Sequence, residues 1–381
     1  MAQSSYRMSV AFVTVAMSSC LVALSTDTVF AGSTSGIAAP PSHHGVVEVS
    51  TAGELEYIDK YPSSYLTDNI KIMTNIDLSG YAWNSLGSTA APFSGQFDGQ
   101  GYSISGVSVT NTGVSHEVGF FGTLDGQVSD LNISGTVTVG QFSNAGLLAG
   151  EQNGGSIINS STAGSVSAPE GGSIGGLVGN QAGGSIQESF SNASVTGGFS
   201  VGGLVGNQNG MISNSYATGT TNDGSTAEGG LVGLENAGSI TDSYATGSLV
   251  NGIPFDTGGL IGDYNTGTNT NDYFLQTSPS ESGAGFAVGG SAGDVKGLST
   301  NQFALTNSFT GFDFTNTWGV SKTINYGYPY LLAFYPGSGG IPGKLPEVPF
   351  AGLLPLVVVV GLGVLAFDRR KRASIPFANE S

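Results

Sequence analysis

The stretch GGLVGNQNGMISNSYATGT occupies residues 202–220, and GGLVGLENAGSITDSYATGS repeats its pattern at 229–248. The glycine-rich block that opens both stretches occurs six times. Its copies are VGFFG (118–122), GLLAG (146–150), GGLVG (175–179, 202–206 and 229–233) and GGLIG (258–262). Their last glycines lie 27 to 29 residues apart. A fixed period of this length is typical of repeat architectures, in which each unit buries its apolar face against its neighbours.

Each unit has the composition of short strands joined by turns. Apolar runs of three to five residues, rich in Val, Ile, Leu, Tyr and Thr, alternate with Gly, Asn, Ser and Asp. No unit shows helical periodicity, and glycine supplies 62 of the 381 residues, which is costly in helix interiors. The repeat therefore predicts an all-β parallel β-helix, or β-solenoid, of about eight coils of about 28 residues each, with neighbouring coils about 4.8 Å apart.

Matching positions in successive units should form rows along the rod. A leucine row and an isoleucine row are predicted to fill the interior, while an aromatic row has no face that the sequence assigns. These rows are Leu177, Leu204, Leu231 and Leu260; Ile157, Ile186, Ile212 and Ile240; and Phe190, Tyr216, Tyr244 and Tyr273.

A polar row shares one repeat position and has two interpretations. Its members are Asp130, Asn159, Glu188, Asn214 and Asp242. Stacked carboxylates and amides are suited to a cation or a sugar, whereas Asn and Asp are also the usual turn residues that bond neighbouring backbone. The turn interpretation is favoured over the ligand interpretation.

These units resemble the GLUG motif of bacterial surface proteins. The flanks agree, since TNIDLSG (74–80) and FSGQFDGQGYSISGVSV (93–109) are similar to the segment that precedes such repeats, and 297–332 resembles their closing segment. The resemblance covers about 46–335 and implies a right-handed parallel β-helix at the cell surface. It implies no agreed activity, because the motif occurs in proteins described as adhesins and as peptidases.

Both ends of the rod should carry caps that cover unpaired strand edges. Thr51 and Glu54 have capping-box spacing before LEYIDKY, which predicts a short helix. A second short helix is expected over 300–309. Aromatic and apolar residues beyond it are expected to cover the last coil, namely Trp318, Tyr326, Tyr328, Tyr330 and Leu331.

The N-terminus has the pattern of a secretory signal peptide. Residues 8–24 are largely apolar after Arg7, and Val29-Phe30-Ala31 predicts cleavage before Gly32. A cytosolic protein with a hydrophobic terminus and a lipoprotein processed at Cys20 are less favoured alternatives. Cys20 is the single cysteine and lies in this leader, so the mature chain is expected to lack disulfides and thiolate metal sites.

The C-terminus has the pattern of a membrane anchor. Residues 350–367 carry no charge and, as a helix, would span about one hydrocarbon core. Four basic residues follow at 369–372, so the tail is expected in the cytoplasm. The ending resembles a Gram-positive sorting signal, although Leu345-Pro346-Glu347-Val348-Pro349 lacks the Thr and Gly of LPxTG; a simple membrane anchor and a non-standard sorting enzyme both remain open.

Charge excludes some partners. The formal net charge is −17, and no Lys or Arg occurs between Lys71 and Lys296. Such a surface has almost nothing to exchange for the counterions of nucleic acid, so no nucleic-acid partner is expected.

Motifs for catalysis are scarce. A β-helix lyase would need Lys or Arg near the cleaved bond, and residues 72–295 have none. An inverting hydrolase needs only two carboxyl groups about 6.5–9.5 Å apart, for which Glu188 with Asp242, or Asp256 with Asp263, are candidates. The histidines are His43, His44 and His116, and no GxSxG, HExxH or calcium-loop pattern accompanies them. No catalytic, cofactor-binding or metal-binding residue is assigned, and no cofactor is expected.

The sequence thus predicts eight segments: a signal peptide (1–31), a flexible mature N-terminus (32–45), a cap with lead-in coils (46–115), the GLUG-repeat solenoid (116–275), a C-terminal cap (276–335), a Pro/Gly-rich linker (336–349), a transmembrane helix (350–367) and a basic cytoplasmic tail (368–381). The preferred function is a non-catalytic surface protein of a Gram-positive bacterium that displays an acidic rod for adhesion to a glycan or protein, or as envelope material. The alternative is an extracellular carbohydrate-active hydrolase or a peptidase.

Overall fold

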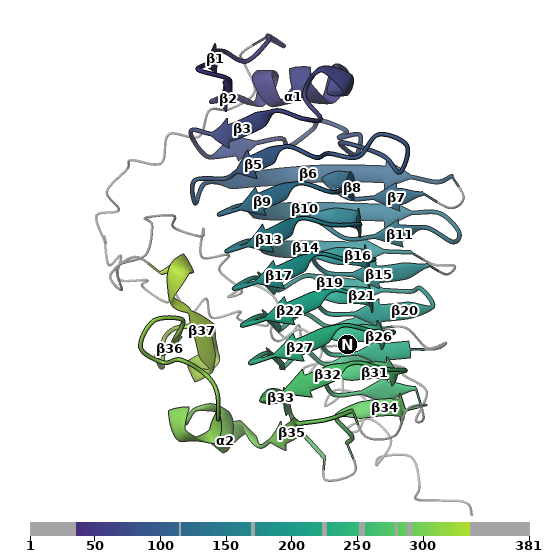
Figure 1. The fold of residues 1–381 in the computed structure, drawn as a ribbon, viewed down its shortest axis with the longest axis vertical. Coiled ribbons are helices and arrows are strands. Elements are labelled where there is room, and N and C mark those ends of the chain that lie inside the picture. Colours follow the sequence, from purple (N-terminus) through teal and green to yellow (C-terminus); the bar gives the residue numbers. More distant parts are fainter. Residues whose placement is uncertain are drawn as a thin grey trace, which may run out of the picture.

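The computed structural model describes residues 36–113, 116–168, 172–222, 227–250, 256–278, 281–287 and 292–335. These residues form a parallel β-solenoid, a rod of coils stacked along its long axis (Figure 1). It has about seven turns of about 28 residues, one fewer than the expected eight. Within this part of the chain, no helix is long and apolar enough to cross a membrane. The predicted signal peptide, linker, transmembrane helix and tail lie outside the described residues.

Four sheets run along the rod. In a central coil the chain passes through the six-, seven-, ten- and twelve-stranded sheets in that order. The six-stranded sheet contains β7 (Glu117–Val118), β11 (Asn144–Ala145), β15 (Ser173–Gly175), β20 (Ser200–Gly202), β25 (Ala227–Gly229) and β30 (Thr257–Gly258). The seven-stranded sheet contains β8 (Phe121–Leu124), β12 (Ala149–Gln152), β16 (Val178–Gln181), β21 (Val205–Gln208), β26 (Val232–Glu235), β31 (Ile261–Tyr264) and β34 (Ala284–Ala287).

The other two sheets begin closer to the N-terminus. The ten-stranded sheet contains β1 (Ser42–His43), β2 (Val46–Val49), β3 (Asn69–Ile72), β5 (Gln96–Asp98), β9 (Gln127–Ser129), β13 (Ser156–Ile158), β17 (Ser185–Gln187), β22 (Met211–Ser213), β27 (Ser239–Thr241) and β32 (Thr268–Thr270). The twelve-stranded sheet contains β4 (Ile76–Asp77), β6 (Ser103–Asn111), β10 (Asn132–Val139), β14 (Ser161–Ser167), β18 (Phe190–Ser191), β19 (Ser194–Thr196), β23 (Tyr216–Ala217), β24 (Thr221–Asn222), β28 (Tyr244–Ala245), β29 (Leu249–Val250), β33 (Asp272–Leu275) and β35 (Val295–Leu298).

The coil-to-coil register confirms the predicted rows. Ile186 pairs with Ile157 on one side and with Ile212 on the other, and all three strands run parallel. Every member of the leucine row and of the isoleucine row is at most 1 % exposed. Each such side chain contributes about 1.5–3 kcal/mol by leaving water, so the two rows supply a large part of the interior.

The glycine-rich block forms the corner where the six- and seven-stranded sheets meet. A Cβ on Gly202 would lie 1.9 Å from the carbonyl oxygen of Val205, which belongs to the next strand of the same coil. A Cβ on Gly206 would lie 2.4 Å from the backbone nitrogen of Ile174 in the preceding coil. Both sheets therefore approach to backbone contact, which leaves no room for a side chain and explains why the glycines recur in every unit.

The predicted N-terminal helix is confirmed. Helix α1 (Ala52–Lys60) begins with a capping box, in which the Thr51 side chain accepts from the Glu54 N–H and Glu54 accepts from the backbone of Thr51. It is followed by η1 (Pro62–Ser64). Before it, β1 and β2 pair antiparallel, so part of the segment expected to be flexible forms a hairpin at the end of the ten-stranded sheet.

The C-terminal segment is placed differently from the prediction. Residues 299–335, here called the C-terminal arm, turn back and lie along the side of the rod (Figure 1). The expected second helix is only one turn long. The arm contains α2 (Thr300–Phe303), η2 (Thr306–Ser308), β36 (Trp318–Val320), η3 (Asn325–Gly327), β37 (Pro329–Leu331) and η4 (Leu332–Phe334).

The arm covers the aromatic row on the outer face of the twelve-stranded sheet. The rings of Phe190, Tyr216 and Tyr244 stack in parallel, with centroids 4.7 and 4.9 Å apart. Trp318 is fully buried against Tyr244 and donates from its indole nitrogen to Asn214 Oδ1 at 3.1 Å. Leu298 of β35 and five buried arm residues complete this second core, the latter being Phe303, Phe309, Phe312, Leu331 and Phe334.

The expectation that these residues cover the last coil is therefore wrong in part. Trp318 and Leu331 are buried against the side of the rod, and Tyr328 packs there on Phe303. Tyr326 is 81 % exposed and covers nothing. The aromatic row explains the difference, because four large rings on an outer sheet face are stabilised only if another segment removes them from water.

The glycine corner predicts a sharp contrast between two Gly→Ala substitutions. Gly206→Ala should destabilise the rod by about 1–3 kcal/mol or more, since the new methyl group meets backbone atoms that cannot move independently. Gly154→Ala is the matched control, because its Cβ would find only one atom within 4 Å, at 3.9 Å. Urea unfolding of the full chain measures both, and equal midpoints for the two variants would contradict the backbone-contact explanation.

Candidate functional site

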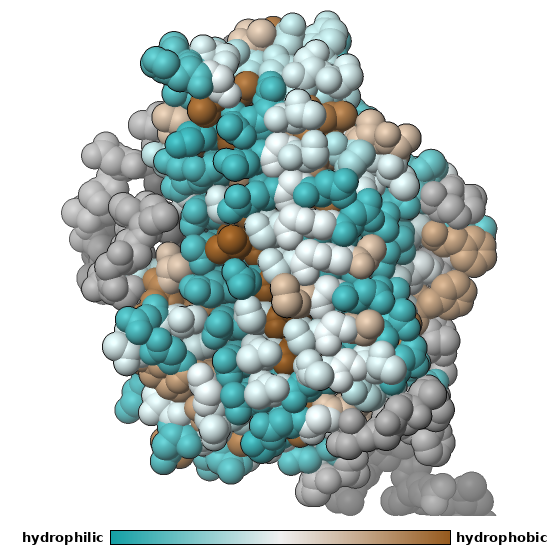
Figure 2. Space-filling model, viewed as in Figure 1, coloured by the Kyte–Doolittle hydropathy of each residue, from teal (hydrophilic) through white to brown (hydrophobic). Residues whose placement is uncertain are grey.

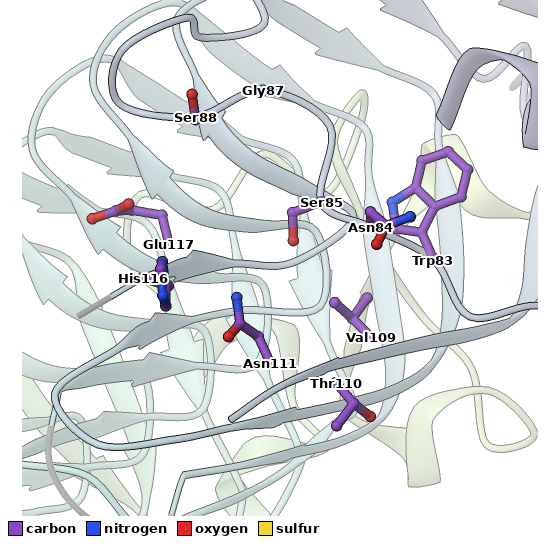
Figure 3. A pocket seen from close by; sticks show the side chains of 10 residues that line it. All are labelled: Trp83, Asn84, Ser85, Gly87, Ser88, Val109, Thr110, Asn111, His116 and Glu117. Atoms are coloured by element: carbon purple, nitrogen blue, oxygen red, sulfur yellow. The ribbon is translucent and has the colours of Figure 1, made fainter. Parts of the chain in front are cut away.

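A hollow lies at the N-terminal coils of the rod. It has a volume of about 240 Å³ and is lined by Trp83, Asn84, Ser85, Gly87, Ser88, Val109, Thr110, Asn111, His116 and Glu117. The lead-in segment before β5 supplies one wall, and the end of β6 with the start of β7 supplies the other. Figure 3 shows Ser85 and Asn111 between His116 on one side and Trp83 on the other.

Hydrogen bonds inside this hollow mostly hold its walls together. Thr89 donates to Glu117 Oε2 at 3.0 Å, and the Gly119 N–H donates to Ser85 Oγ at 3.2 Å. Trp83 is only 2 % exposed, because its ring stacks on Phe120 and its indole nitrogen donates to the Phe120 carbonyl at 2.8 Å. The tryptophan is therefore part of the core and offers no face to a ligand.

The hollow does not contain an assembled catalytic triad. Among the described residues, no hydrogen bond links the His116 imidazole to a serine hydroxyl or to a carboxylate. His43 lies elsewhere, in β1, with Nε2 4.0 Å from Glu48 Oε2, and His44 occupies the turn that follows. The three histidines are thus not brought together.

The polar row has the geometry of a turn ladder. Asp130, Asn159, Glu188, Asn214 and Asp242 all have φ between 46° and 52°, in the left-handed region. Each backbone N–H of the row donates to a carbonyl of the next coil, as Asn214 does to Thr241 at 3.0 Å. Side chains bond along the row too, since Asn159 Nδ2 donates to Asp130 Oδ1 at 3.3 Å. These contacts confirm that the row lies in turns, but the side chains bond other side chains and not the neighbouring backbone that the turn interpretation expected.

The two predicted carboxyl pairs differ in the structure. Asp256 and Asp263 lie close enough to interact, and burial, with the charge of Asp256 second, raises the pKa of Asp263 to about 6. Glu188 and Asp242 are two coils apart with Asn214 between them, and burial alone raises the pKa of Glu188. Of the two pairs, the first therefore shows an electrostatic interaction between its carboxyl groups and the second shows none.

The described residues do not form a metal-binding cluster. Over the residues that the structure describes, no group of three or more His, Cys, Asp or Glu side chains is arranged to hold a metal ion. The ion pairs found there are likewise few: His43 with Glu48, Lys71 with Asp98 at 3.8 Å, and Lys296 with Asp294 at 2.7 Å.

Sequence reasoning missed three carboxyl groups inside the rod. Glu228, Glu235 and Asp272 are all fully buried. Two of them stand where the preceding coil has an uncharged residue. Glu228 pairs in register with Val201, and Glu235 pairs in register with Gln208. Aligning the units residue by residue would have found these exceptions.

Asp272 replaces a serine in a row of buried hydroxyls. Ser189, Ser215 and Ser243 each accept from the backbone N–H of the preceding serine of the row, at 3.1 to 3.2 Å. Asp272 continues this role, since its Oδ1 accepts from the Ser243 N–H at 2.9 Å and its Oδ2 from the Thr270 N–H at 3.0 Å. Burial raises the pKa of Asp272, and these two donors oppose that rise.

Comparison with known proteins agrees with this architecture. The family model described as "Glug: The GLUG motif" matches residues 197–222, so the chain carries the GLUG motif that the repeat predicts. A solved structure from Bacteroides ovatus, described as "a putative immunoglobulin A1 protease", is similar to 75 % of this chain and 92 % of its own, with a TM-score of 0.56 and 21 % sequence identity. At this identity the likeness concerns the fold. No curated protein matches the chain.

The turn ladder predicts a stabilising substitution. Glu188 holds a left-handed conformation that costs most L-residues roughly 1–2 kcal/mol and that Asn adopts more readily, so Glu188→Asn should stabilise the rod by about 1 kcal/mol. Glu188→Gln removes the charge but keeps the unfavourable backbone preference, so the difference between the two variants isolates the backbone. Chemical denaturation measures both. A Glu188→Asn protein no more stable than Glu188→Gln would contradict the turn explanation.

Proposed function

We propose that this protein is a non-catalytic surface protein that displays a stiff, acidic, right-handed β-solenoid outside a Gram-positive cell. The proposal rests on the positions of the side chains that recur in every repeat unit. Within the described coils, the recurring residues of each unit form the stacking rows and the turn ladder, and no row gathers reactive groups at one place.

The outer surface supports a display role. Figure 2 shows a face on which hydrophilic and neutral side chains predominate and hydrophobic ones appear as separate spots. Isolated apolar residues are normal on a soluble surface. Together with the net charge of −17, this surface favours a solvated rod whose contacts are with neutral or basic partners, such as a surface glycan or a protein. Adhesion and envelope structure are the two roles that we propose for it.

Anchoring is proposed from the sequence of the C-terminus. Residues 350–367 would form the transmembrane helix, with 368–381 in the cytoplasm and the rod outside. The leader 1–31 would direct secretion and be removed after Ala31.

Topology is testable on intact cells that make the full chain. External protease should remove the rod and spare an epitope placed after Ser381, and deletion of 350–381 should release the protein into the medium. Deletion of 373–381 is the matched control, because it keeps the apolar stretch and all four basic residues and should leave the protein attached. Cell-bound protein after deletion of 350–381 would refute this anchor.

A second candidate function is proteolysis. It is favoured by the description of the B. ovatus protein and by a hollow that places Ser85, His116 and Glu117 along one cavity. Because the likeness is limited to the fold and the imidazole has no described link to a hydroxyl, we place this candidate second.

Direct assay separates the two candidates. The purified full chain should leave immunoglobulin A1, generic peptide substrates and glycans uncleaved. Ser85→Ala and His116→Ala are the decisive variants if cleavage is seen. Cleavage that both substitutions abolish, while urea unfolding stays unchanged, would establish the peptidase and overturn the display proposal.

A further inference from the structure

A row of buried amide side chains runs along the end of the seven-stranded sheet. Gln152, Gln181, Gln208 and Glu235 are the last residues of β12, β16, β21 and β26 and pair with one another in register. All four are 0 % exposed. We call them the amide row, and Glu235 is its one carboxyl member.

The glutamines of this row tie each coil to the next. Gln152 Nε2 donates to the Ser185 carbonyl at 3.2 Å, and Gln181 Nε2 donates to the Met211 carbonyl at 3.2 Å. Gln208 Nε2 donates to the Ser239 carbonyl at 3.3 Å and to the Gly210 carbonyl at 2.6 Å. The bonds to Ser185, Met211 and Ser239 each reach from one coil to the ten-stranded sheet of the following coil, whereas the bond to Gly210 stays within the coil of Gln208. The row therefore joins successive coils from within.

The next acceptor in this series belongs to Thr268. Ser185, Met211, Ser239 and Thr268 pair in register, and each donates its N–H to the preceding coil, as Thr268 does to the Gly238 carbonyl at 3.1 Å. In a parallel strand the N–H and C=O of one residue point the same way, so the Thr268 carbonyl points back toward the coil of Glu235.

The carboxyl group of Glu235 lies at this place. Its Oε2 accepts from Asn269 Nδ2 at 2.9 Å. A Cβ on Gly267 would lie only 2.0 Å from Oε1, so Oε1 is directed at the turn that leads into Thr268. Among the described residues, Oε1 has no hydrogen-bond partner, although it is buried. An ionised carboxylate has no proton to donate to a carbonyl, whereas a carboxylic acid has one.

We propose that Glu235 is a proton-dependent lock on the last coils of the rod. In its acid form Glu235 donates from Oε1 to the Thr268 carbonyl and continues the series that the glutamines make. In its carboxylate form it loses that bond and leaves a negative charge inside the rod, so the coil of residues 257–275 opens more readily.

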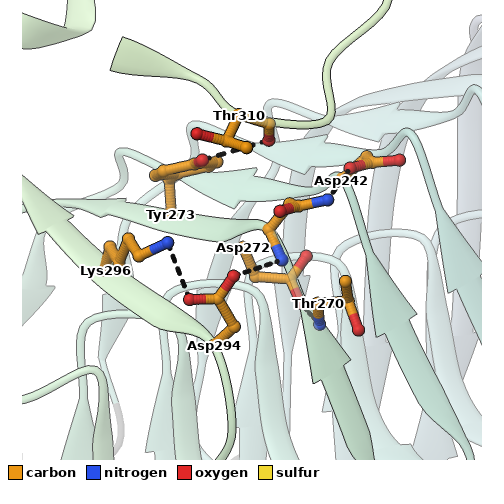
Figure 4. A network of polar contacts seen from close by, with 8 residues as sticks. Asp242, Thr270, Asp272, Tyr273, Asp294, Lys296 and Thr310 are labelled. Atoms are coloured by element: carbon orange, nitrogen blue, oxygen red, sulfur yellow. Dashed lines mark hydrogen bonds and ion pairs between the residues drawn. The ribbon is translucent and has the colours of Figure 1, made fainter.

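The groups around Glu235 do not compensate its charge. Asp272 on β33 is a carboxyl group that interacts with it, and Asp242 interacts with Asp272 in turn. Tyr264 on β31 follows Glu235 in register and donates its hydroxyl to the Gly267 carbonyl at 3.0 Å. Lys296 is paired with Asp294 at 2.7 Å (Figure 4), and its side chain is about half exposed.

The direction of the pH effect follows from burial. Burial raises the pKa of Glu235 from its ordinary 4.5 to about 7, while the hydrogen bond from Asn269 opposes the rise. A group whose pKa is higher in the folded state stabilises that state below its unfolded pKa, and this contribution is lost as pH rises through the folded pKa. The lock should therefore hold at pH 4.5 and weaken as the pH approaches and passes 7.

Hydrogen exchange on the full chain tests the lock. After correction for the intrinsic rate, the opening constant reported by the amides of Asn265 and Thr268 should rise on the order of 50-fold between pH 5 and pH 8. The amides of Val205 and Met211, two coils away, should change by only a few-fold. Glu235→Gln should remove most of the rise at Asn265 and Thr268, because the amide donates at every pH.

Two further variants identify the responsible group. Gln208→Glu should create a new rise near Ser239, whereas Gln187→Glu adds the same charge on an exposed residue and should not. Asp272→Ser restores the serine row and should leave the Glu235 effect in place. A Glu235→Gln protein that keeps the full rise, or equal effects of Gln208→Glu and Gln187→Glu, would overturn the proposal. These readouts are independent of binding and of cell attachment, so they stand apart from the proposed function.

Discussion

Backbone contact between the six- and seven-stranded sheets is the constraint on which the rest of the rod depends. At Gly202 and Gly206 a Cβ would lie within 2.4 Å of backbone atoms, so the chain can turn this corner only with glycine. This glycine corner occurs at the same position in each coil, so it aligns every coil with the next one. The register of the leucine, isoleucine and turn rows then follows, since parallel stacking places equivalent residues directly above one another.

Stacking in register also determines how polar groups survive inside the rod. A buried hydroxyl or amide is stabilised only if it is hydrogen-bonded, and here the next coil always presents the same backbone group at the same place. The hydroxyls of the serine row and the Nε2 groups of the amide row exploit this regularity. A carboxyl group in the amide row breaks this regularity. The glutamines donate from Nε2 to a carbonyl of the next coil, whereas an ionised Glu235 has no proton to donate to the corresponding carbonyl.

The C-terminal arm gives the protein a second core that the repeat does not contain. Its contacts reach from Tyr273 back to Phe190, where Phe334 packs edge-on at 4.8 Å. The described chain thus ends beside the middle of the rod and not at its last coil.

The sequence by itself determined the coil length, the two interior rows, the capped N-terminal helix and the turn row, because each follows from local spacing that repeats or from one capping box. It could not assign the aromatic row to a face, since an inward and an outward aromatic ring have the same spacing. Only the tertiary structure decided that the arm returns along that row, because this contact joins residues such as Asn214 and Trp318 that lie 104 positions apart and follow no period. The same holds for the candidate sites: the sequence named His116 and the pair Asp256 and Asp263, whereas the burial of Glu235 and its partner atoms across neighbouring coils are visible only in the folded chain. Periodicity fixes which residues stack, whereas the environment of a single exception depends on atoms that only the folded chain brings together.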